Sequence, residues 1–384
     1  MDKYIRTYAE IDLDAIESNF NELKSCVADG TKLCAVIKAD GYGHGAVMLA
    51  DLLKDKADYF AVATSDEAVE LRNAGVTKPI LILSYTHEDD FDILIDNNIE
   101  FTVFTSENAQ KLSLHAQKKG KNAKIHVAVD TGMSRIGVTP DENGLEEIKK
   151  IAQLDSLELT GIFSHFACAD MADKSVTELQ MRRFKDFLKI LNKNNISFPI
   201  RHISNSAAIS ETQEHFDMVR MGISLYGLYP SDEVDKSRVK LIPAMTLKSH
   251  ITHIKDVTAG EGISYGHIYK TTQTRRIATI SAGYADGYPR ALSDVGTVYV
   301  NGNCAPIRGR VCMDQFMIDV TDIENISVDD EVVLFGRNGV SAEEIGSMSM
   351  SFNYEVVCAV SRRIPRVYKK NGETVAVTNY LRGK

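Results

Sequence analysis

The chain has 384 residues, of which 44% are hydrophobic and 25% charged, and its formal net charge at neutral pH is −9. This composition is typical of a globular protein, the length indicates two domains, and the acidic balance argues against nucleic acid as a partner. Because there is no run of about 18 apolar residues and no apolar signal core at the N-terminus, we expect a cytoplasmic protein with no membrane partner.

The N-terminal part alternates predicted strands and helices. A lone strand at 8–14 comes first, and Asp14 is expected to cap the helix after it, with Glu17 completing a capping box. A strand–helix unit of roughly 25–30 residues then repeats, which is the size of a βα unit. The repeated strands are short and nearly all apolar, as strands buried on both faces must be. They span 33–38, 59–63, 79–84, 100–104, 124–130, 158–165, 201–204 and 218–223.

Helical periodicity fills the intervals between these strands. Thr64 and Glu67 form a capping box that opens one helix, and Gly75 ends it. Eight alternating units favour an N-terminal (β/α)8 TIM-type barrel over residues 1–240, with a doubly wound sheet as the alternative. Other predicted helices span 46–53, 105–120, 143–154 and 177–194, the last with an apolar face of Leu179, Phe184, Phe187, Leu188 and Leu191.

The pattern changes after about residue 240, where helical periodicity nearly vanishes. Short alternating segments predict a mainly antiparallel β domain over residues 241–384, with which residues 1–14 are candidates to pair. A single helix is expected near 341–348. The predicted strands are 249–257, 277–282, 297–301, 306–320 and 331–335.

Polar side chains follow several predicted barrel strands at the end where barrels place their chemistry. Lys38 follows the first strand and precedes glycines at 41, 43 and 45. The set contains no carboxylate pair for glycoside hydrolysis and no evident Ser-His-Asp triad. Its other members are Asp130 to Arg135, Ser164, His165, Ser204, Asn205, Ser206, and Arg220 to Gly222.

A lysine facing a phosphate site indicates pyridoxal 5′-phosphate, whose aldehyde needs an amine for a Schiff base. Asn205, Ser206, Gly222 and Ile223 lie after the last two barrel strands, where barrels often bind phosphate. Arg220 could meet the pyridine nitrogen and leave it unprotonated, because a guanidinium does not release its proton. Such a ring favours simple proton transfer over reactions that need a long-lived carbanion.

Each of these residues also has an ordinary interpretation. Lys38 alone is typical of a surface lysine, His165 of a satisfied core histidine, and Arg135 of a solvated ion-pair partner. Their joint placement at strand ends is what favours a site. The six cysteines form no C-x-x-C pair and the histidines no H-E-x-x-H pattern, so we expect no metal.

Four motifs match those of one known family. They are Val36 to Gly45 (VIKADGYGHG), Asp130 to Arg135 (DTGMSR), Gly283 to Arg290 (GYADGYPR) and Cys312 to Asp314 (CMD). With them the sequence resembles the alanine racemases, pyridoxal-phosphate enzymes built from a barrel and a β domain. The resemblance extends nearly end to end, from Ala9 to Arg366.

The resemblance implies a function and a distribution of roles. L-alanine and D-alanine would be interconverted by proton transfer between two bases, Lys38 and Tyr265, on the aldimine of the cofactor, supplying D-alanine for bacterial peptidoglycan. Tyr265 would reach the partner subunit's barrel, so a homodimer with shared sites is implied. Tyr42, His165, Asn205, Ser206, Arg220, Gly222 and Ile223 would bind the cofactor, and Arg135, Met313 and Tyr284 would bind or admit the substrate.

Two positions depart from the family pattern. Ala128 stands where many members carry a carbamylated lysine, and we expect a chloride ion or a water in place of that anion. Arg362 stands where a tyrosine near the phosphate is common, which leaves substantial serine activity as an alternative.

Two further hypotheses compete with a racemase. One is an amino-acid decarboxylase of the same architecture, against which Tyr265 and the Cys-Met-Asp motif argue. The other is a non-catalytic cofactor carrier, against which the β domain argues, because such carriers resemble the barrel alone.

Overall fold

A computed structural model describes residues 5–383, which form two compact units. The barrel unit comprises residues 17–41 and 46–241. The β unit comprises residues 42–45, the residues from 242 onward and the N-terminal residues up to Ile16. The short segment 42–45, which follows Lys38, is therefore packed with the β unit rather than with the strands that flank it in sequence.

Within the described residues, eight parallel strands of the barrel unit form one sheet in the order β4-β3-β2-β9-β8-β7-β6-β5. The two ends of this sheet meet, since Ile82 N donates to Glu100 O at 3.0 Å and Glu100 N donates to Ile80 O at 2.8 Å. The sheet is thus a closed barrel: the (β/α)8 prediction is confirmed and the doubly wound alternative is wrong. The strands are β2 (Lys32–Val36), β3 (Tyr59–Val62), β4 (Ile80–Ile82), β5 (Phe101–Val103), β6 (Ala123–Ala128), β7 (Leu157–Phe163), β8 (Ile200–His202) and β9 (Met218–Met221).

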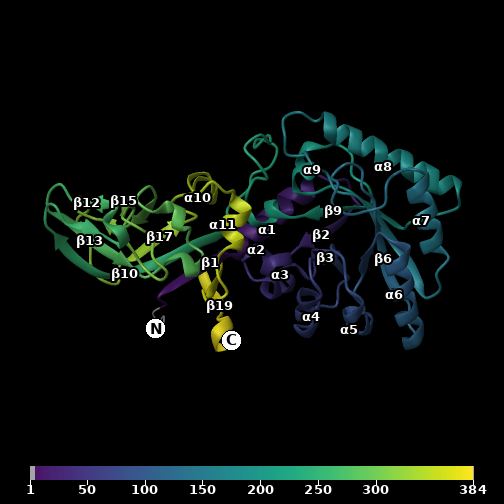
Figure 1. Cartoon of the computed structure of the whole chain (residues 1–384), viewed down its shortest axis with the longest axis horizontal. Coiled ribbons are helices and arrows are strands. Elements are labelled where there is room, and N and C mark those ends of the chain that lie inside the picture. Colours follow the sequence, from purple (N-terminus) through teal and green to yellow (C-terminus); the bar gives the residue numbers. More distant parts are fainter. Residues whose placement is uncertain (1–4, 384) are drawn as a thin grey trace. The chain divides into compact units, whose positions relative to one another are not determined.

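Helices lie on the outside of this sheet, as Figure 1 shows for α4, α6, α7 and α8. The predicted capping box is present: Thr64 Oγ1 accepts from Glu67 N at 3.3 Å, and Glu67 Oε2 accepts from Thr64 N at 3.2 Å. The helices that flank the strands are α1 (Leu13–Ser25), α3 (Ala46–Leu53), α4 (Ser65–Asn73), α5 (Phe91–Asp96), α6 (Ser106–Lys119), α7 (Glu142–Ala152), α8 (Ser175–Lys193) and α9 (Ser206–Glu211).

Two details of the helix predictions are wrong. Asp14 does not cap α1, because it is already the second residue of the helix, and Asp12 Oδ1 accepts from Ala15 N at 2.9 Å. Leu179 is 37% exposed, because it lies off the stripe that contains Phe184 and its neighbours at helical spacing. Thr177 and Gln180 complete the buried face of α8 instead.

The β unit contains a sheet of nine strands among the described residues, in the order β13-β16-β15-β14-β17-β10-β1-β18-β19. A further pairing of β13 with β10 closes six of these strands on themselves. Strand β1 is antiparallel to β10 and parallel to β18. The strands are β1 (Thr7–Asp12), β10 (Met245–Val257), β13 (Arg275–Ile280), β14 (Thr297–Val300), β15 (Asn303–Arg308), β16 (Phe316–Asp319), β17 (Glu331–Phe335), β18 (Arg366–Lys370) and β19 (Glu373–Thr378).

The mainly antiparallel character is confirmed, with local corrections. The segment 306–320 is two strands separated by a connection at 309–315, rather than one strand. The helix near 341–348 is present as α10 (Ala342–Met348), and α11 (Asn353–Cys358) follows it. The sequence did not predict β18 or β19. The small hairpin of β11 (Gly262–Ile263) and β12 (Tyr269–Lys270) frames the turn that contains Tyr265.

The buried face of α8 gives a direct test of the barrel packing. We expect Phe184→Ala to lower the free energy of unfolding by about 3–5 kcal/mol, because it leaves a cavity under a fully buried ring. Leu179→Ala on the same helix should change it by no more than about 0.5 kcal/mol. Denaturant unfolding of both variants measures the difference, and equal losses would contradict this orientation of α8.

Candidate active site

Lys38 lies at the end of β2, where the backbone makes a left-handed turn. Ala39, Asp40, Gly41 and Tyr42 have φ values of 51°, 54°, 61° and 51°. This conformation costs a non-glycine residue about 1–2 kcal/mol, so three such residues around Gly41 indicate a functional constraint. Gly41 N donates to Ile37 O at 2.8 Å and closes the turn.

Neighbouring carboxylates stabilise this strained turn. Glu67 Oε1 accepts from Ala39 N at 2.6 Å, and Asp40 Oδ1 accepts from Ala46 N at 3.0 Å. A Cβ at Gly41 would lie 2.7 Å from Leu49 Cδ1 and 3.3 Å from Ala46 N, so a side chain there would crowd the start of α3. The turn redirects the chain immediately after Lys38 and leaves the half-buried lysine at the tip of the strand.

The loop after β6 is held by Asp130 and ends in Arg135. Asp130 Oδ1 accepts from the backbone N–H groups of Gly132, Met133 and Ser134 at 2.9, 3.0 and 3.0 Å. Three hydrogen bonds to one carboxylate oxygen fix the backbone of this motif. The exposed Arg135 side chain therefore extends from a loop whose position is set by the strand end.

Arg220 is 3% exposed in β9 and makes an unusual number of hydrogen bonds. Its Nη2 shares its two hydrogens among three acceptors: Ser164 O at 2.8 Å, His165 Nδ1 at 3.0 Å and Ile203 O at 3.1 Å. Its Nη1 donates to His202 Nδ1 at 2.7 Å. None of the hydrogen bonds that Arg220 makes among residues 5–383 uses its Nε. Burial lowers the pKa of Arg220 to about 10, so the guanidinium stays charged at neutral pH.

His165 lies among three cations. Burial holds the pKa of His165 well below its ordinary value, and the positive charges of Arg220, Arg135 and Lys38 lower it further. Because His165 Nδ1 accepts from Arg220, the imidazole is neutral and carries its proton on Nε2. The barrel thus brings together four predicted site residues: Lys38, Arg135, His165 and Arg220.

The loops after β8 and β9 are joined through Ser206. Its Oγ accepts from Gly222 N at 2.9 Å and from Ser224 N at 3.3 Å. Asn205 caps α9, with Oδ1 accepting from Ala208 N at 3.1 Å. Ile223 is the first residue of a 3-10 turn, so its N–H has no acceptor within that turn. A hydroxyl group and backbone N–H groups therefore gather at this edge of the barrel, as an anion requires.

The remaining predicted site residues belong to the β unit. Tyr42 is buried there, with its ring 6.3 Å from that of Tyr354. Tyr265, Met313 and Tyr284 are 72%, 52% and 42% exposed. Tyr265 lies in an exposed 3-10 turn rather than in a strand.

Backbone hydrogen bonds join the two loops that carry Tyr284 and Met313. Tyr284 N donates to Cys312 O at 3.1 Å, and Ala285 N donates to Met313 O at 3.0 Å. Gly283 permits this approach, because a Cβ at that position would lie 2.2 Å from Cys312 O. The two substrate candidates of the β unit are therefore fixed relative to each other.

A buried carboxylate anchors the same two loops. Asp286 is fully buried; its Oδ1 accepts from Arg6 Nη2 at 2.5 Å and from Arg363 Nε at 2.7 Å, and its Oδ2 accepts from Gly283 N at 2.9 Å. Arg363 Nη2 also donates to Asp314 Oδ1 at 2.6 Å. Asp286 raises the pKa of Arg363 above its ordinary value. No local sequence signal predicts this cluster, because its arginines come from opposite ends of the chain.

The departures from the family pattern lie in defined surroundings. Ala128 is buried at the end of β6, and the expected anion or water beside it stays a prediction. The Arg362 guanidinium lies 5.0 Å from the centre of the Tyr380 ring, in the β unit.

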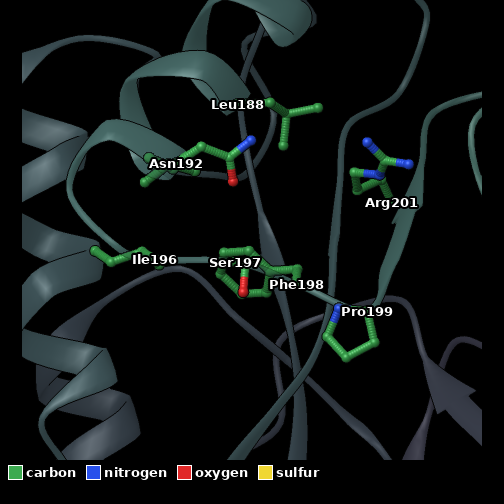
Figure 2. Close-up of a pocket in the computed structure, with 8 residues that line it drawn as sticks. Leu188, Asn192, Ile196, Ser197, Phe198, Pro199 and Arg201 are labelled. Atoms are coloured by element: carbon green, nitrogen blue, oxygen red, sulfur yellow. The ribbon is translucent and has the colours of Figure 1, made fainter.

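A cavity of about 200 Å³ lies elsewhere on the barrel. Figure 2 shows it between the end of α8, with Leu188 and Asn192, and the start of β8, with Arg201. This is the amino end of β8, whereas barrel chemistry is placed at the carboxyl ends of the strands. The cavity is therefore not the candidate site.

A lysine, a histidine and two arginines at the carboxyl ends of the strands are typical of a barrel enzyme. The comparisons with known proteins agree with this class. Residues 11–230 match the family described as "Alanine racemase, N-terminal domain", and residues 244–368 match "Alanine racemase, C-terminal domain". The chain belongs to the alanine racemase family, whose members are isomerases.

Individual relatives match over almost the whole chain. The sequence is 47% identical to "Alanine racemase 1" of Clostridium acetobutylicum, over 99% of this chain and 100% of that protein. The fold is similar to that of alanine racemase from Clostridium difficile 630, with a TM-score of 0.96, 46% identity and coverage of 99% and 100%. It is also similar to the Bacillus anthracis alanine racemase with bound L-Ala-P, with a TM-score of 0.94, 37% identity and full coverage of both chains.

The Asp286 cluster predicts a large asymmetry between two aspartates. Asp286→Asn should lower the free energy of unfolding by about 3–5 kcal/mol, because it leaves two arginines beside an uncharged buried group. Asp314→Asn should cost no more than about 1 kcal/mol, because Asp314 is an exposed partner of Arg363. Equal losses in denaturant unfolding would show that Asp286 is not the anchor.

The buried histidines predict how stability depends on pH. The pKa values of His165 and His202 are both held well below the ordinary value, chiefly by burial. Below about pH 6.5 the unfolded chain binds protons that the folded chain does not, so stability falls as the pH decreases. We expect the free energy of unfolding to fall by up to about 1.4 kcal/mol per pH unit for each histidine. In His202→Asn this dependence on pH should be less steep. Unfolding free energies that stay constant from pH 7 to pH 5 would contradict this.

Proposed function

We propose that this protein interconverts L-alanine and D-alanine with pyridoxal 5′-phosphate as its cofactor. The observation that carries the proposal is the arrangement of Lys38, Arg135 and Arg220 around His165 at the carboxyl end of the barrel, in a chain of the alanine racemase family. Relatives that match over nearly the full length are named for this activity.

The residues present fit this cofactor. The hydrogen bonds of Arg220 among the described residues use Nη1 and Nη2, so its Nε can donate to an unprotonated ring nitrogen. Ser206 offers its hydroxyl hydrogen and Ile223 its backbone N–H for the phosphate, and Gly222, which donates to Ser206 Oγ, would line the same site. When bound, pyridoxal phosphate supplies an aldehyde that bonds amino groups and a ring that acidifies the hydrogen on the α-carbon of the amino acid. Asn205 would position this loop, and His165 and Tyr42 would also line the cofactor.

Inversion at a carbon atom requires proton removal on one face and delivery on the other, hence two bases. Lys38 Nζ would hold or release the proton on one face, and the hydroxyl group of Tyr265 on the opposite face. Arg135 and the backbone at Met313 would bind the substrate carboxylate, and Tyr284 would line the entry. Arg220 keeps its own proton, so the site favours proton transfer at the α-carbon.

The exposure of Tyr265, Tyr284 and Met313 supports a shared site in a homodimer. These three residues of the β unit are exposed to solvent in the single chain. They can therefore contribute to a site at the barrel of a partner subunit. Supply of D-alanine to cytoplasmic peptidoglycan synthesis is the role we propose for the product. Arg362 packs over Tyr380, and no observation favours substantial serine activity.

Covalent trapping tests the cofactor and the lysine together. Protein purified with pyridoxal phosphate should be yellow, and borohydride should fix the chromophore irreversibly to the peptide that contains Lys38, as mass spectrometry would show. Lys38→Ala should lose the trapped adduct and the racemase activity, whereas Lys32→Ala, an exposed lysine on the same strand, should keep both.

Two outcomes would overturn the proposal. One is a colourless protein that gains no absorbance with added pyridoxal phosphate. The other is an adduct on a lysine other than Lys38. Release of carbon dioxide from an amino acid, with no change in the chirality of alanine, would favour a decarboxylase instead.

A further inference from the structure

A chain of buried polar side chains extends from Arg220 through the inside of the barrel. Arg220 Nη1 donates to His202 Nδ1 at 2.7 Å, and His202 Nε2 lies 2.9 Å from His126 Nδ1. His126 Nε2 lies 3.0 Å from Glu100 Oε2. All four side chains are buried, and the hydroxyl of Tyr59 lies near Glu100. The roles proposed above for the cofactor site involve only the Arg220 end of this hydrogen-bond chain.

The direction of every hydrogen bond in this chain follows from Arg220. A guanidinium can only donate, so His202 Nδ1 must accept, and its proton is on Nε2. That proton is donated to His126 Nδ1, which places the proton of His126 on Nε2. His126 then donates to Glu100, whose carboxylate accepts. Both imidazoles are therefore neutral and have the same tautomer.

The chain connects the two ends of the barrel. Glu100 directly precedes β5, at the amino end of the sheet, whereas His202 is the last residue of β8 and Arg220 lies near the carboxyl end of β9. His126 lies in the middle of β6. The polarised groups thus lead from a carboxylate at one end of the barrel to the cation at the candidate site.

Apolar packing encloses this route. The ring of Phe163 stacks on His202 at 4.9 Å and 12°, and the Arg220 guanidinium lies 5.5 Å from the centre of the Phe163 ring. Gly161 leaves the space that His126 fills, since a Cβ there would lie 2.3 Å from His126 Nδ1. A charge in such surroundings is costly unless it is compensated.

The Arg220 guanidinium has no carboxylate in direct contact among residues 5–383. Its contacts are two backbone carbonyls and two neutral imidazoles. Cys34 lies close enough to affect its charge, but burial raises the pKa of that thiol to about 12, so it is uncharged at neutral pH. Glu100 is the anion to which the hydrogen bonds lead.

We propose that Glu100, acting through His126 and His202, is a positioning residue that fixes the orientation and offsets the charge of Arg220. The effect of Glu100 on a bound cofactor rests on the proposed function. The hydrogen-bond chain itself does not depend on it. Loss of the carboxylate would leave Arg220 freer to rotate and more strongly positive beside the ring nitrogen.

The tautomers are tested first, in the full chain labelled with ¹⁵N-histidine and freed of cofactor. Long-range ¹H–¹⁵N spectra should show His126 and His202 as neutral Nε2–H tautomers at pH 7, with assignments from His126→Gln and His202→Asn. An Nδ1–H tautomer or an imidazolium at either position would overturn the proposal. Because no cofactor is used, this result is independent of whether the protein is a racemase.

A double-mutant cycle then tests whether Glu100 acts through His202. His202→Asn keeps an acceptor for Arg220 but cannot reach His126, and Glu100→Gln keeps the hydrogen bond but removes the charge. Each change should lower kcat by about 10- to 100-fold, the loss typical for the outer partner of a functional group, with KM little changed. Each should also shift the absorbance maximum of bound pyridoxal phosphate. If the two residues act through the same hydrogen-bond chain, the kcat of the double variant should be no lower than that of the less active single variant.

The control is Glu146→Gln, which breaks an exposed ion pair with Lys149 and should leave kcat and the spectrum unchanged. Losses that multiply in the double variant, or an unshifted spectrum in Glu100→Gln, would overturn the proposal and leave Glu100 a structural residue. If Glu100→Gln does not fold, the tautomer measurement on the unaltered chain still decides. A wild-type protein that binds no pyridoxal phosphate would instead refute the proposed function.

Discussion

The site depends on one buried cation. Arg220 has almost no contact with solvent, yet its guanidinium stays charged, and it contacts carbonyls and imidazoles rather than a carboxylate. Because His165 accepts from Arg220, the His165 imidazole is neutral, and Nε of Arg220 remains as a donor. A guanidinium that never gives up its proton restricts what a bound ring can do, and the proposed proton transfer between two faces of alanine follows from this restriction.

The candidate residues are held by contacts that differ between the two units. In the barrel unit, a left-handed turn sets Lys38 at its strand tip, and one carboxylate, Asp130, orders the loop that leads to Arg135. In the β unit, Asp286 binds two arginines and so fixes the loops of Tyr284 and Met313. Each unit thus presents a rigid part of a proposed site, which is what a reaction with two bases in fixed positions requires.

Much of the fold could be predicted, because the apolar runs of the barrel strands and the helical spacing between them are local signals. The strand ends then identified Lys38, His165 and Arg220 as neighbours. The remainder depends on contacts between residues distant in sequence. Arg366 is buried in β18 only because backbone carbonyls of residues 43, 360, 361 and 364 surround its guanidinium. His126 and His202 are polar residues within predicted apolar strands, a signal that could have led to them, whereas Glu100 is the first residue of its predicted strand, where a charged side chain is ordinarily exposed.

Tyr265 provides the most direct test of the central claim, that two bases act on opposite faces of alanine. Each enantiomer would be incubated in D₂O with Tyr265→Phe, and both racemisation and deuterium incorporation at the α-carbon would be followed. With Lys38 as the remaining base, one enantiomer should still exchange its α-hydrogen with retention of configuration, while racemisation falls by about 10²- to 10⁴-fold. Racemisation at the wild-type rate would contradict the account.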